Sequence, residues 1–445
     1  MRIAVIGAGA AGCFAAVNIA RMLPGSRITI YESGKKTLAK VAVTGGGRCN
    51  LTNSFNAVKS TEAVYPRGAR LMKRLMHVFS HRDTMRWFEN EGVRLVTQDD
   101  GCVFPASQDA MEIVGTLRTL ARLNGVNVRL QHRAESVRRT QNGYAITFTQ
   151  QPEEEADIVV VTTGGSPKAG GLRFLDPLNL DIVAPVPSLF SLNIGGDDLH
   201  RLAGTVVKNV TAGLAGTKIR TGGPLLITHW GMSGPAILKL SAFAARTLNE
   251  NAYTADIIIN WFGDMRDCQV AELLETTAAR NPQKMLQSVT PEQFNSRLWN
   301  FLLHECGING NQRWAELGKK SINRMAATLT AHTFRVTGKC RWKEEFVTCG
   351  GVALTNVSPS TLEAREHPGL YFAGEVLDID AVTGGFNLQA AWTTAYVVAK
   401  SISEKKEQCL TPFRLSENAE KNRAETARRP QKTCRDMKNP DKRKS

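Results

Sequence analysis

The sequence contains no long hydrophobic run. No apolar stretch among its 445 residues approaches the roughly 18–20 residues that a membrane-spanning helix needs. A strand pattern begins within two residues of Met1, which leaves no room for a charged leader segment. We therefore expect a cytoplasmic protein without a membrane anchor.

Paired cysteines are also missing. The nine cysteines are scattered, and none forms a Cys-x-x-Cys motif, so neither a disulfide framework nor a zinc site is expected. His77 and His81 have the i,i+4 spacing of a metal-binding helix face, but their neighbours are basic and no carboxylate lies between them. A solvated helix face is the favoured interpretation, and we expect no metal.

Negative charge is scarce relative to positive charge. The chain has 56 Lys and Arg against 41 Asp and Glu, a formal net charge of +15. Residues 404–445 contribute 13 of the basic and 7 of the acidic residues, so the rest of the chain is basic as well. This balance favours an anionic partner without identifying it. Residues 404–445 have few apolar side chains, and we expect them to form a basic, disordered tail.

The chain does have enough hydrophobic material for more than one core. It is 42% hydrophobic and exceeds the roughly 250–300 residues at which a single core stops growing. Residues 3–6 and 28–32 have the pattern of buried parallel strands around a helix at 13–22, which is a βαβ unit. Other expected helices lie at 67–92 (one or two), 111–124, 270–280, 291–306 and 387–403. Other expected strands lie at 126–130, 134–139, 144–149, 157–162 and 370–375.

The parallel-strand pattern stops near residue 185 and returns near the end of the chain. We therefore expect an α/β fold in which residues 1–185 and 349–403 form a nucleotide-binding domain. An inserted domain with short strands and helices would occupy residues 186–348. Asn142-Gly143 predicts a hairpin between two of the strands, and residues 33–53 have the composition of a long, polar, glycine-rich loop.

The first turn of the βαβ unit carries the sequence Gly7-Ala8-Gly9-Ala10-Ala11-Gly12. Gly7 permits a tight turn, Gly9 lets the backbone approach a pyrophosphate, and Gly12 allows close helix packing. The helix N-terminus would attract the phosphates, and Glu32 would accept a hydrogen bond from the adenosine ribose. The alternative is a glycine turn without a ligand. The motif alone does not distinguish FAD from NAD.

Two motifs near the far end of the chain favour FAD. Gly374-Glu375-Val376-Leu377-Asp378 follows the late strand, and Thr383-Gly384-Gly385-Phe386-Asn387 opens the last long helix. In a doubly wound sheet both lie beside the first glycine turn. An acid there can hold the ribityl chain, and free amides at the helix start can stabilise negative charge on a reduced flavin. A helix start without a ligand is the alternative.

A third glycine-rich segment runs from Thr44 through Gly45-Gly46-Gly47 to Asn53. Three glycines give a backbone that a flat ring can approach closely. Arg48 could bind a phosphate or a carbonyl oxygen, and Asn50 could hydrogen-bond a ring edge. With a reference pKa of about 8.5, Cys49 is mostly a protonated thiol at neutral pH and could donate a proton. Alternatively, Cys49 is a small packing residue.

These motifs resemble those of the BaiN/RdsA-like flavoproteins, also described as aminoacetone-oxidase-like NAD(P)/FAD-dependent enzymes. The resemblance covers nearly all of residues 1–403. It is carried by the first glycine turn with Glu32, by residues 40–53, by residues 228–236 (Thr-His-Trp-Gly-Met-Ser-Gly-Pro-Ala), and by residues 347–352 together with 374–389. It implies a glutathione-reductase-like FAD domain interrupted by a β-rich and helical insert.

The resemblance and the motifs together give the expected site. The expected catalytic residues are Cys49, Arg48 and Asn50. The expected cofactor-binding residues are Gly7, Gly9, Ala10, Ala11, Gly12, Glu32, Lys40, Thr44, Gly45, Gly46, Gly47, Arg48, Gly164, Gly374, Glu375, Asp378, Gly384, Gly385, Phe386 and Asn387. The sequence departs from the family after Thr163-Gly164-Gly165, where its loop is shorter, and in the basic tail, to which no role carries over.

Only one full dinucleotide fingerprint is present, so FAD has a binding site and NADPH or NADH would bind transiently as electron donor. Members of the family have been linked to reduction of uridine to dihydrouridine in large-subunit rRNA. Others have been linked to reduction of small enones such as bile-acid intermediates. Both reactions saturate a C=C bond conjugated to a carbonyl, so hydride from a reduced flavin and a proton from an acid would serve either one.

The basic charge favours the RNA reaction, because a target base must be unstacked while phosphates are held. One basic stretch could track a phosphate backbone or be a solvated helix face; it comprises Arg67, Arg70, Lys73, Arg74, Arg82 and Arg86. Residues 432–444 could be a phosphate-binding arm or a solubilising tail. Two other functions stay open: a reductase or oxidase of a small enone or amine, and a flavin-containing factor that binds RNA without modifying it.

Overall fold

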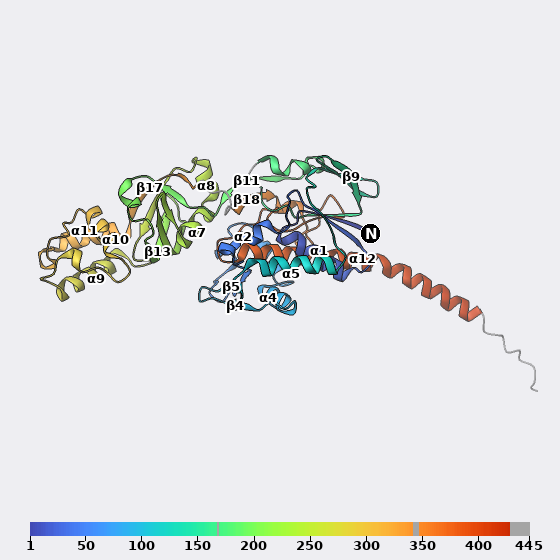
Figure 1. The fold of residues 1–445 in the computed structure, drawn as a ribbon, viewed down its shortest axis with the longest axis horizontal. Helices are drawn as coiled ribbons and strands as arrows, with labels where there is room; N and C mark the ends of the chain where they lie inside the picture. The colour runs from blue at the N-terminus through green and yellow to red at the C-terminus, as the bar shows by residue number, and fades with distance from the viewer. Residues whose placement is uncertain (167–168, 341–346, 428–445) are drawn as a thin grey trace, which may run out of the picture.

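The computed structural model describes residues 1–166, 169–340 and 347–427, of which residues 407–427 are described by their backbone only. The molecule has two lobes (Figure 1). One lobe contains both the first and the last described segments of the chain, and the other is built from the middle of the sequence. A long final helix projects from the first lobe.

The first lobe is organised around a five-stranded parallel sheet in the order β19-β10-β1-β2-β6. Its strands are β1 Arg2–Ile6, β2 Arg27–Tyr31, β6 Asn127–Arg129, β10 Ile158–Val161 and β19 Leu370–Phe372. The strands β1 and β10 are runs of Ile, Val and Ala with buried side chains, as expected for parallel strands covered on both faces. The pairing of β10 with β19 brings the end of the sequence back beside its beginning.

Helices α1 (Ala10–Met22), α5 (Ala110–Leu123) and α12 (Phe386–Ala427) pack beside this sheet (Figure 1). Phe14 of α1 and Trp392 of α12 are fully buried, and their rings lie 5.2 Å apart. The remaining elements of this lobe are α2 Ala39–Gly47, α3 Ala69–Leu75, α4 His81–Asn90, β3 Thr52–Asn53, β4 Leu95–Thr97, β5 Cys102–Pro105, β7 Ala134–Thr140, β8 Gly143–Phe148 and β9 Gln151–Ala156.

Some expectations for this lobe are confirmed and some are wrong. The hairpin is present, because Thr140 pairs with Gly143 across a two-residue turn. The expected loop at 33–53 is interrupted by α2, which loses helical geometry at Thr44 and Gly45. The helical spacing of His77 and His81 is also wrong, because α3 ends at Leu75 and His81 begins α4 after the capping residue Ser80.

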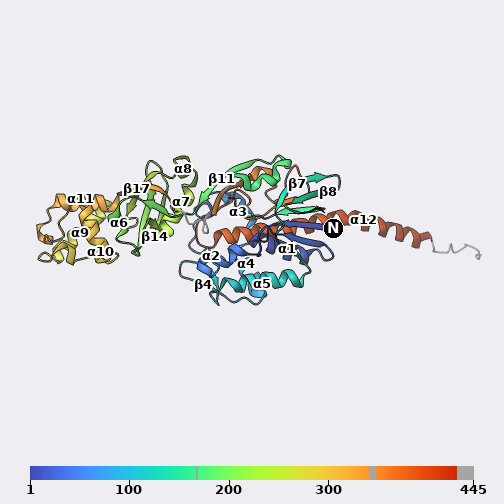
Figure 2. The same ribbon diagram turned by 45° about the horizontal axis from the view of Figure 1, so that its top comes forward.

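The second lobe is a closed six-stranded barrel with helices packed on it (Figure 2). The barrel strands are β12 Leu192–Ile194, β15 Gly231–Ser233, β14 Arg220–Thr228, β13 Val206–Leu214, β16 Ala255–Asn260 and β17 His332–Lys339. The helices are α6 Asp197–His200, α7 Pro235–Phe243, α8 Ala245–Glu250, α9 Asp267–Arg280, α10 Ser296–Glu305 and α11 Lys319–Thr330. Its core contains Trp261, Trp299 and Trp314 and is separate from that of the first lobe.

Two antiparallel strands connect the lobes. β11 (Ile182–Ser188) leads out of the first lobe and β18 (Val347–Val352) returns to it, with Ser188 paired to Val347. Short 3-10 segments complete the fold at Thr61–Ala63, Ala169–Leu178, Leu286–Ser288, Trp314–Glu316 and Leu354–Asn356.

The fold class expected from the sequence is therefore confirmed: a Rossmann-type α/β domain with a parallel sheet and an inserted β-rich region. We propose the division 1–185, 186–348 and 349–403 from the two separate cores. The backbone of α12 continues to Ala427, past the boundary that we placed at 404, and residues 428–445 of the expected tail lie outside the described residues. Within the described ranges, no helix is both long and apolar enough to cross a membrane.

Candidate functional site

The first glycine turn leaves no room for side chains at two of its three glycines. A Cβ on Gly7 (φ +106°) would lie 2.5 Å from the Thr162 carbonyl oxygen, and one on Gly12 would lie 1.9 Å from the Gly7 oxygen. A Cβ on Gly9 would meet nothing within 4 Å. Gly7 and Gly12 are thus required by packing, whereas Gly9 faces open space.

The start of α1 suits an anion. Gly9 occupies the N-cap, no described side chain caps this end, and the first turn carries no acidic residue. The first amide groups of a helix are left without intrahelical partners, and they favour phosphate. The geometry therefore fits a pyrophosphate bound over Gly9.

Glu32 is fixed at the end of β2 by two backbone amides. Its Oε2 accepts from Ala8 N (2.8 Å) and its Oε1 from Gly34 N (2.7 Å). Oε1 also accepts from Ser33 Oγ (3.3 Å), whereas Oε2 can accept a further hydrogen bond. The side chain is therefore held beside the glycine turn with acceptor capacity left for a ribose hydroxyl.

The loop after β19 meets both the first turn and the loop after β10. A Cβ on Gly374 (φ +79°) would lie 2.9 Å from the Cβ of Ala11. Glu375 accepts from Thr348 N (2.8 Å) and lies 3.5 Å from the Lys40 ammonium. A Cβ on Gly165, the neighbour of Gly164, would lie 2.5 Å from Glu375 Oε1. The structure thus brings together Lys40, Gly164, Gly374 and Glu375 from three separate parts of the sequence.

The glycine-rich segment presents an open, apolar edge. Gly46 and Gly47 have positive φ angles, and a Cβ on either would meet nothing within 4 Å. Val43, just before them, is 58% exposed. The open surroundings of Gly46 and Gly47 leave room for a planar ring, so the residues present fit a flavin.

The glycine-rich segment is bonded to the start of α12. Asn53 Nδ2 donates to Gly384 O (3.0 Å). In the orientation that satisfies its hydrogen bonds, the Asn50 amide accepts from Gly385 N (3.2 Å) and donates to Thr52 O (3.0 Å). The Tyr65 hydroxyl donates to Phe386 O (2.9 Å). The two segments that were expected to flank the flavin are therefore in direct contact with each other.

The two central residues of this segment differ in exposure. Arg48 is exposed, its guanidinium lies 4.5 Å from the centre of the Phe104 ring, and its Nε donates to Gly45 O (3.2 Å). Cys49 is fully buried at φ +59°, and burial raises the pKa of its thiol to about 12. These are properties of a packing residue, the second of the two roles considered for Cys49. As a proton donor, Cys49 would need the loop to open.

Two other expected cofactor ligands have protein partners. The Asp378 carboxylate lies 3.6 Å from the Arg246 guanidinium of α8 and so faces the inserted lobe. The Asn387 side chain is bonded to both backbone groups of Ala381 (2.9 Å each) and holds the turn that precedes α12. Both residues shape the turn before α12.

The basic stretch is not uniform. Arg67 is part of a buried pair with Asp380 and so cannot track a phosphate backbone, and Arg86 pairs with Asp83. The others, Arg70, Lys73, Arg74 and Arg82, are exposed. Residues 432–444 lie outside the described residues.

Sequence reasoning missed Thr348 and Asp380, although both lie in or beside the family motifs quoted above.

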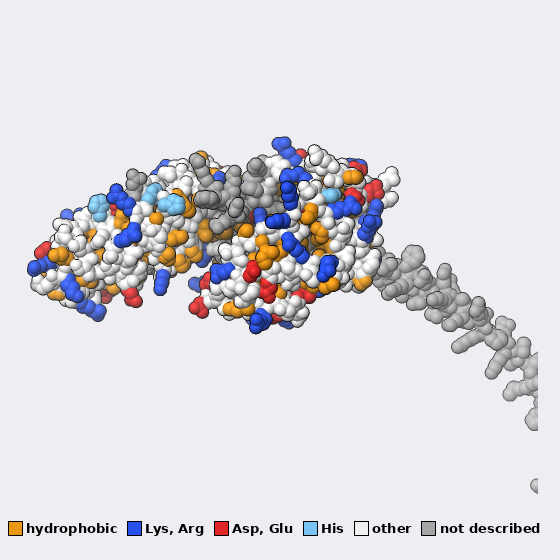
Figure 3. Space-filling view, in the orientation of Figure 1, with side chains coloured by type: hydrophobic (Ala, Val, Ile, Leu, Met, Phe, Trp, Pro, Cys, Tyr) orange, Lys and Arg blue, Asp and Glu red, His pale blue; other side chains and the backbone are white. Residues whose placement is uncertain are grey.

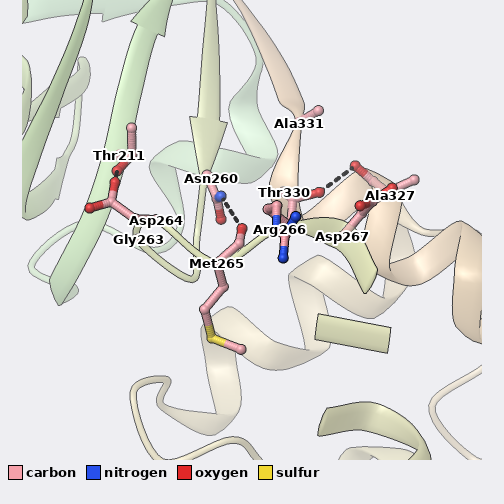
Figure 4. Close-up of a pocket in the computed structure, with 10 residues that line it drawn as sticks. All are labelled: Thr211, Asn260, Gly263, Asp264, Met265, Arg266, Asp267, Ala327, Thr330 and Ala331. Atoms are coloured by element: carbon pink, nitrogen blue, oxygen red, sulfur yellow. Dashed lines mark hydrogen bonds between the residues drawn. The ribbon is translucent and has the colours of Figure 1, made fainter. Parts of the chain in front are cut away.

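A separate open hollow of about 500 Å³ lies on the inserted lobe (Figure 4). Polar groups that line it form hydrogen bonds within the protein: Thr211 Oγ1 donates to Asp264 Oδ1 (2.9 Å), and Asn260 Nδ2 donates to Met265 O (2.8 Å). The lining residues are Thr211, Asn260, Gly263, Asp264, Met265, Arg266, Asp267, Ala327, Thr330 and Ala331, none of which belongs to the glycine motifs. The described residues contain no His, Cys, Asp and Glu group suited to a metal ion.

The sheet, the first glycine turn and the second glycine turn at the start of α12 define a Rossmann-type flavoprotein oxidoreductase. Residues 1–401 match the family described as HI0933-like protein Rossmann domain, and the chain belongs to this family. The resemblance to BaiN/RdsA-like flavoproteins is thereby confirmed, and FAD is the cofactor of the family.

Curated relatives match along almost their whole length. The ribosomal RNA dihydrouridine synthase of Haemophilus influenzae is 27% identical over 413 residues, covering 90% of this chain and 98% of the relative. The 3-dehydro-bile acid delta(4,6)-reductase of Clostridium scindens is 26% identical over 412 residues, covering 91% and 99%. The ribosomal RNA dihydrouridine synthase of Escherichia coli is 26% identical over 410 residues, covering 89% and 97%.

Two solved structures align with most of the chain at low sequence identity. The open conformation of a flavocytochrome c3 fumarate reductase is 14% identical with a TM-score of 0.42, covering 91% of this chain and 78% of that one. Mycobacterium smegmatis Sdh1 in complex with UQ1 is 15% identical with a TM-score of 0.45, covering 91% and 69%.

Proposed function

We propose that this flavoprotein reduces uridine to dihydrouridine in large-subunit ribosomal RNA, with NADPH or NADH as the electron donor. The observation that carries the proposal is the full-length similarity to two relatives named as ribosomal RNA dihydrouridine synthases. The net charge of +15 agrees with an RNA substrate. Figure 3 adds that, on the face shown, Lys and Arg side chains are spread over both lobes.

The site residues have distinct roles in this proposal. Gly9 and the first amides of α1 would hold the pyrophosphate, Glu32 the adenosine ribose, and Glu375 with Lys40 the middle of the cofactor. When bound and reduced by NADPH or NADH, FAD would supply a hydride to C6 of uridine, and a proton would add at C5. The Arg48 guanidinium, held over Phe104 at the exposed end of the loop, would bind the substrate carbonyl oxygen and stabilise the negative charge that develops on it.

A small enone is the second candidate substrate. The bile acid reductase relative is 26% identical, and the match covers 99% of its length. The percent identities therefore do not distinguish a uridine substrate from an enone substrate. Both reactions need the same groups, because each adds a hydride and a proton across a C=C bond conjugated to a carbonyl.

The test is deletion of the gene in its host, followed by mass spectrometry of dihydrouridine in purified large-subunit rRNA. Dihydrouridine should disappear and return when the intact gene is restored. Restoration with Glu32→Arg, which should not bind FAD, separates catalysis from RNA binding alone. If that variant corrects a ribosome-assembly defect, the protein acts as an assembly factor. If dihydrouridine is unchanged in the deletion strain, the proposal fails, and the purified protein should be screened against small enones and amines.

A further inference from the structure

A partly buried arginine lies where the two lobes meet. Arg67 Nε donates to Asp380 Oδ1 (2.5 Å), and its Nη2 donates to Asp380 Oδ2. The same guanidinium donates to Ala242 O (2.7 Å) and to Ser188 Oγ (3.3 Å). The Asp380 side chain is 0% exposed and also accepts from Ser188 Oγ (2.8 Å). The Arg67 guanidinium thus contacts three separate segments of the chain.

Those segments belong to both lobes. Ser188 ends the connecting strand β11, and Ala242 lies on α7 of the inserted lobe, whereas Asp380 lies in the turn between β19 and α12. A second pair, Arg246 with Asp378, joins the inserted lobe to the same turn. The inserted lobe is therefore held against the turn before α12 by two Arg–Asp pairs, one of which is fully buried at the carboxylate.

The turn transmits this contact to the start of α12. Ala381, next to Asp380, has both backbone groups bonded to the Asn387 side chain. Val382 N donates to Val64 O (2.9 Å), three residues before Arg67. Gly384 and Gly385 in turn are bonded to Asn53 and Asn50. A shift of Asp380 would therefore move the glycine turn at Gly384 and Gly385.

Stability alone does not explain a charged pair at this position. Burial raises the pKa of the Asp380 carboxyl, and the Arg67 guanidinium opposes the shift. Apolar residues of similar volume often stabilise a buried site as well as an ion pair does. A bidentate pair instead fixes the direction and distance of its two partners.

We propose that Arg67 and Asp380 are positioning residues that link the seating of the inserted lobe to the α12 turn and so set the reduction potential of the bound FAD. The amides at the start of a helix stabilise nearby negative charge, so their displacement would destabilise the reduced flavin relative to the oxidised one. The inference rests on the FAD binding in the proposed function and on the flavin position that the sequence predicts beside Gly384 and Gly385, and it does not depend on which substrate is reduced.

The test compares Arg67→Lys with Arg21→Lys in the full-length holoprotein. Arg21 forms a bidentate pair with Glu91 (2.7 and 3.0 Å) in the same lobe, but neither residue contacts the α12 turn. The midpoint potential of the flavin is measured by reductive titration, together with the visible spectrum and the melting temperature. For Arg67→Lys we expect at least a tenfold loss in the relative stability of reduced flavin, a shift of about 30 mV to more negative potential. Arg21→Lys should leave the potential unchanged.

A lower melting temperature with an unchanged potential in Arg67→Lys would overturn the proposal and make the pair a structural one. If Arg67→Lys does not fold, Ser188→Ala removes one bond to each partner without removing a charge. It should shift the potential in the same direction by a smaller amount, and a wild-type potential in that variant would also refute the proposal. These readouts need no substrate, so they stand whether or not the gene is required for dihydrouridine.

Discussion

Replacing Gly46 with alanine separates the cofactor-facing role of the glycine-rich segment from its folding. Gly46 has φ +68°, and a Cβ there would meet nothing within 4 Å. Gly25, in the turn after α1, has φ +84° and equally open surroundings. Both alanine variants should therefore destabilise the apoprotein by a similar roughly 1–2 kcal/mol, the cost of a left-handed conformation for a residue with a Cβ.

Only Gly46→Ala should affect FAD. If the flavin lies against this segment, the added methyl group enters space that the ring occupies. Overpacking by one methyl group costs about 1–3 kcal/mol. That corresponds to FAD binding weaker by on the order of 5- to 150-fold.

The assay is a titration of each apoprotein with FAD, followed by the quenching of flavin fluorescence, beside urea unfolding of the same preparations. Gly25→Ala should bind FAD like the unmodified protein. Equal FAD affinities for the two variants would mean that the segment at 44–48 does not contact the cofactor, and the site would have to be redrawn.

Three further outcomes are expected. Cys49 should resist alkylation in the native protein between about pH 7 and pH 9, because burial raises the pKa of its thiol to about 12 and the thiolate forms only above that range. Exposed Cys268 should react over the same range, and peptide mass spectrometry distinguishes the two cysteines. Labelling of Cys49 that rises over this range would contradict its burial. Glu32→Gln should lower the free energy of unfolding by about 1–3 kcal/mol, since its amide nitrogen would face one of the two backbone N–H groups and leave that donor unpaired. The variant should also weaken FAD binding, because it replaces a charged acceptor for the ribose hydroxyl by a neutral one; unchanged affinity would remove Glu32 from the site. Lys40→Ala should change the free energy of unfolding by less than about 1 kcal/mol, because the ion pair that Lys40 forms with Glu375 is exposed at the lysine. The same variant should weaken FAD binding. A calorimetric titration that shows no change in FAD affinity would leave Lys40 only a surface role.

The sequence was most informative where one local pattern determines structure. The buried strands at 3–6 and 157–162, the glycine turn and the hairpin each depend on neighbouring residues, and each is found. The hairpin turns at Gln141 and Asn142, one residue before the expected Asn142-Gly143. Closure of the barrel depends on pairing between strands far apart in the chain, such as Thr211 with Asn260, which no local pattern encodes. The short helix α2 was missed because only six of its residues, Ala39 to Thr44, precede its glycines.

The meeting of the glycine motifs could be predicted from the rule that parallel strands end at one edge of a sheet, and the contacts around Gly374 agree with that rule. The directions of individual side chains could not be predicted in this way. Asp378 lies in the expected turn but faces Arg246, because the position of the inserted lobe decides which partner it finds. Cys49 follows three glycines that look exposed, yet its left-handed backbone accompanies a thiol buried in the core.

The antiparallel pairing of β11 with β18 has a consequence for engineering. Ser188 and Val347 lie opposite each other, so the chain leaves for the inserted lobe and comes back at one point. A two-residue Asn-Gly link between them would turn the pair into an ordinary β-hairpin. Because the two lobes have separate cores, the barrel with its helices can be treated as a cassette, excised at one seam or exchanged for the corresponding segment of a relative.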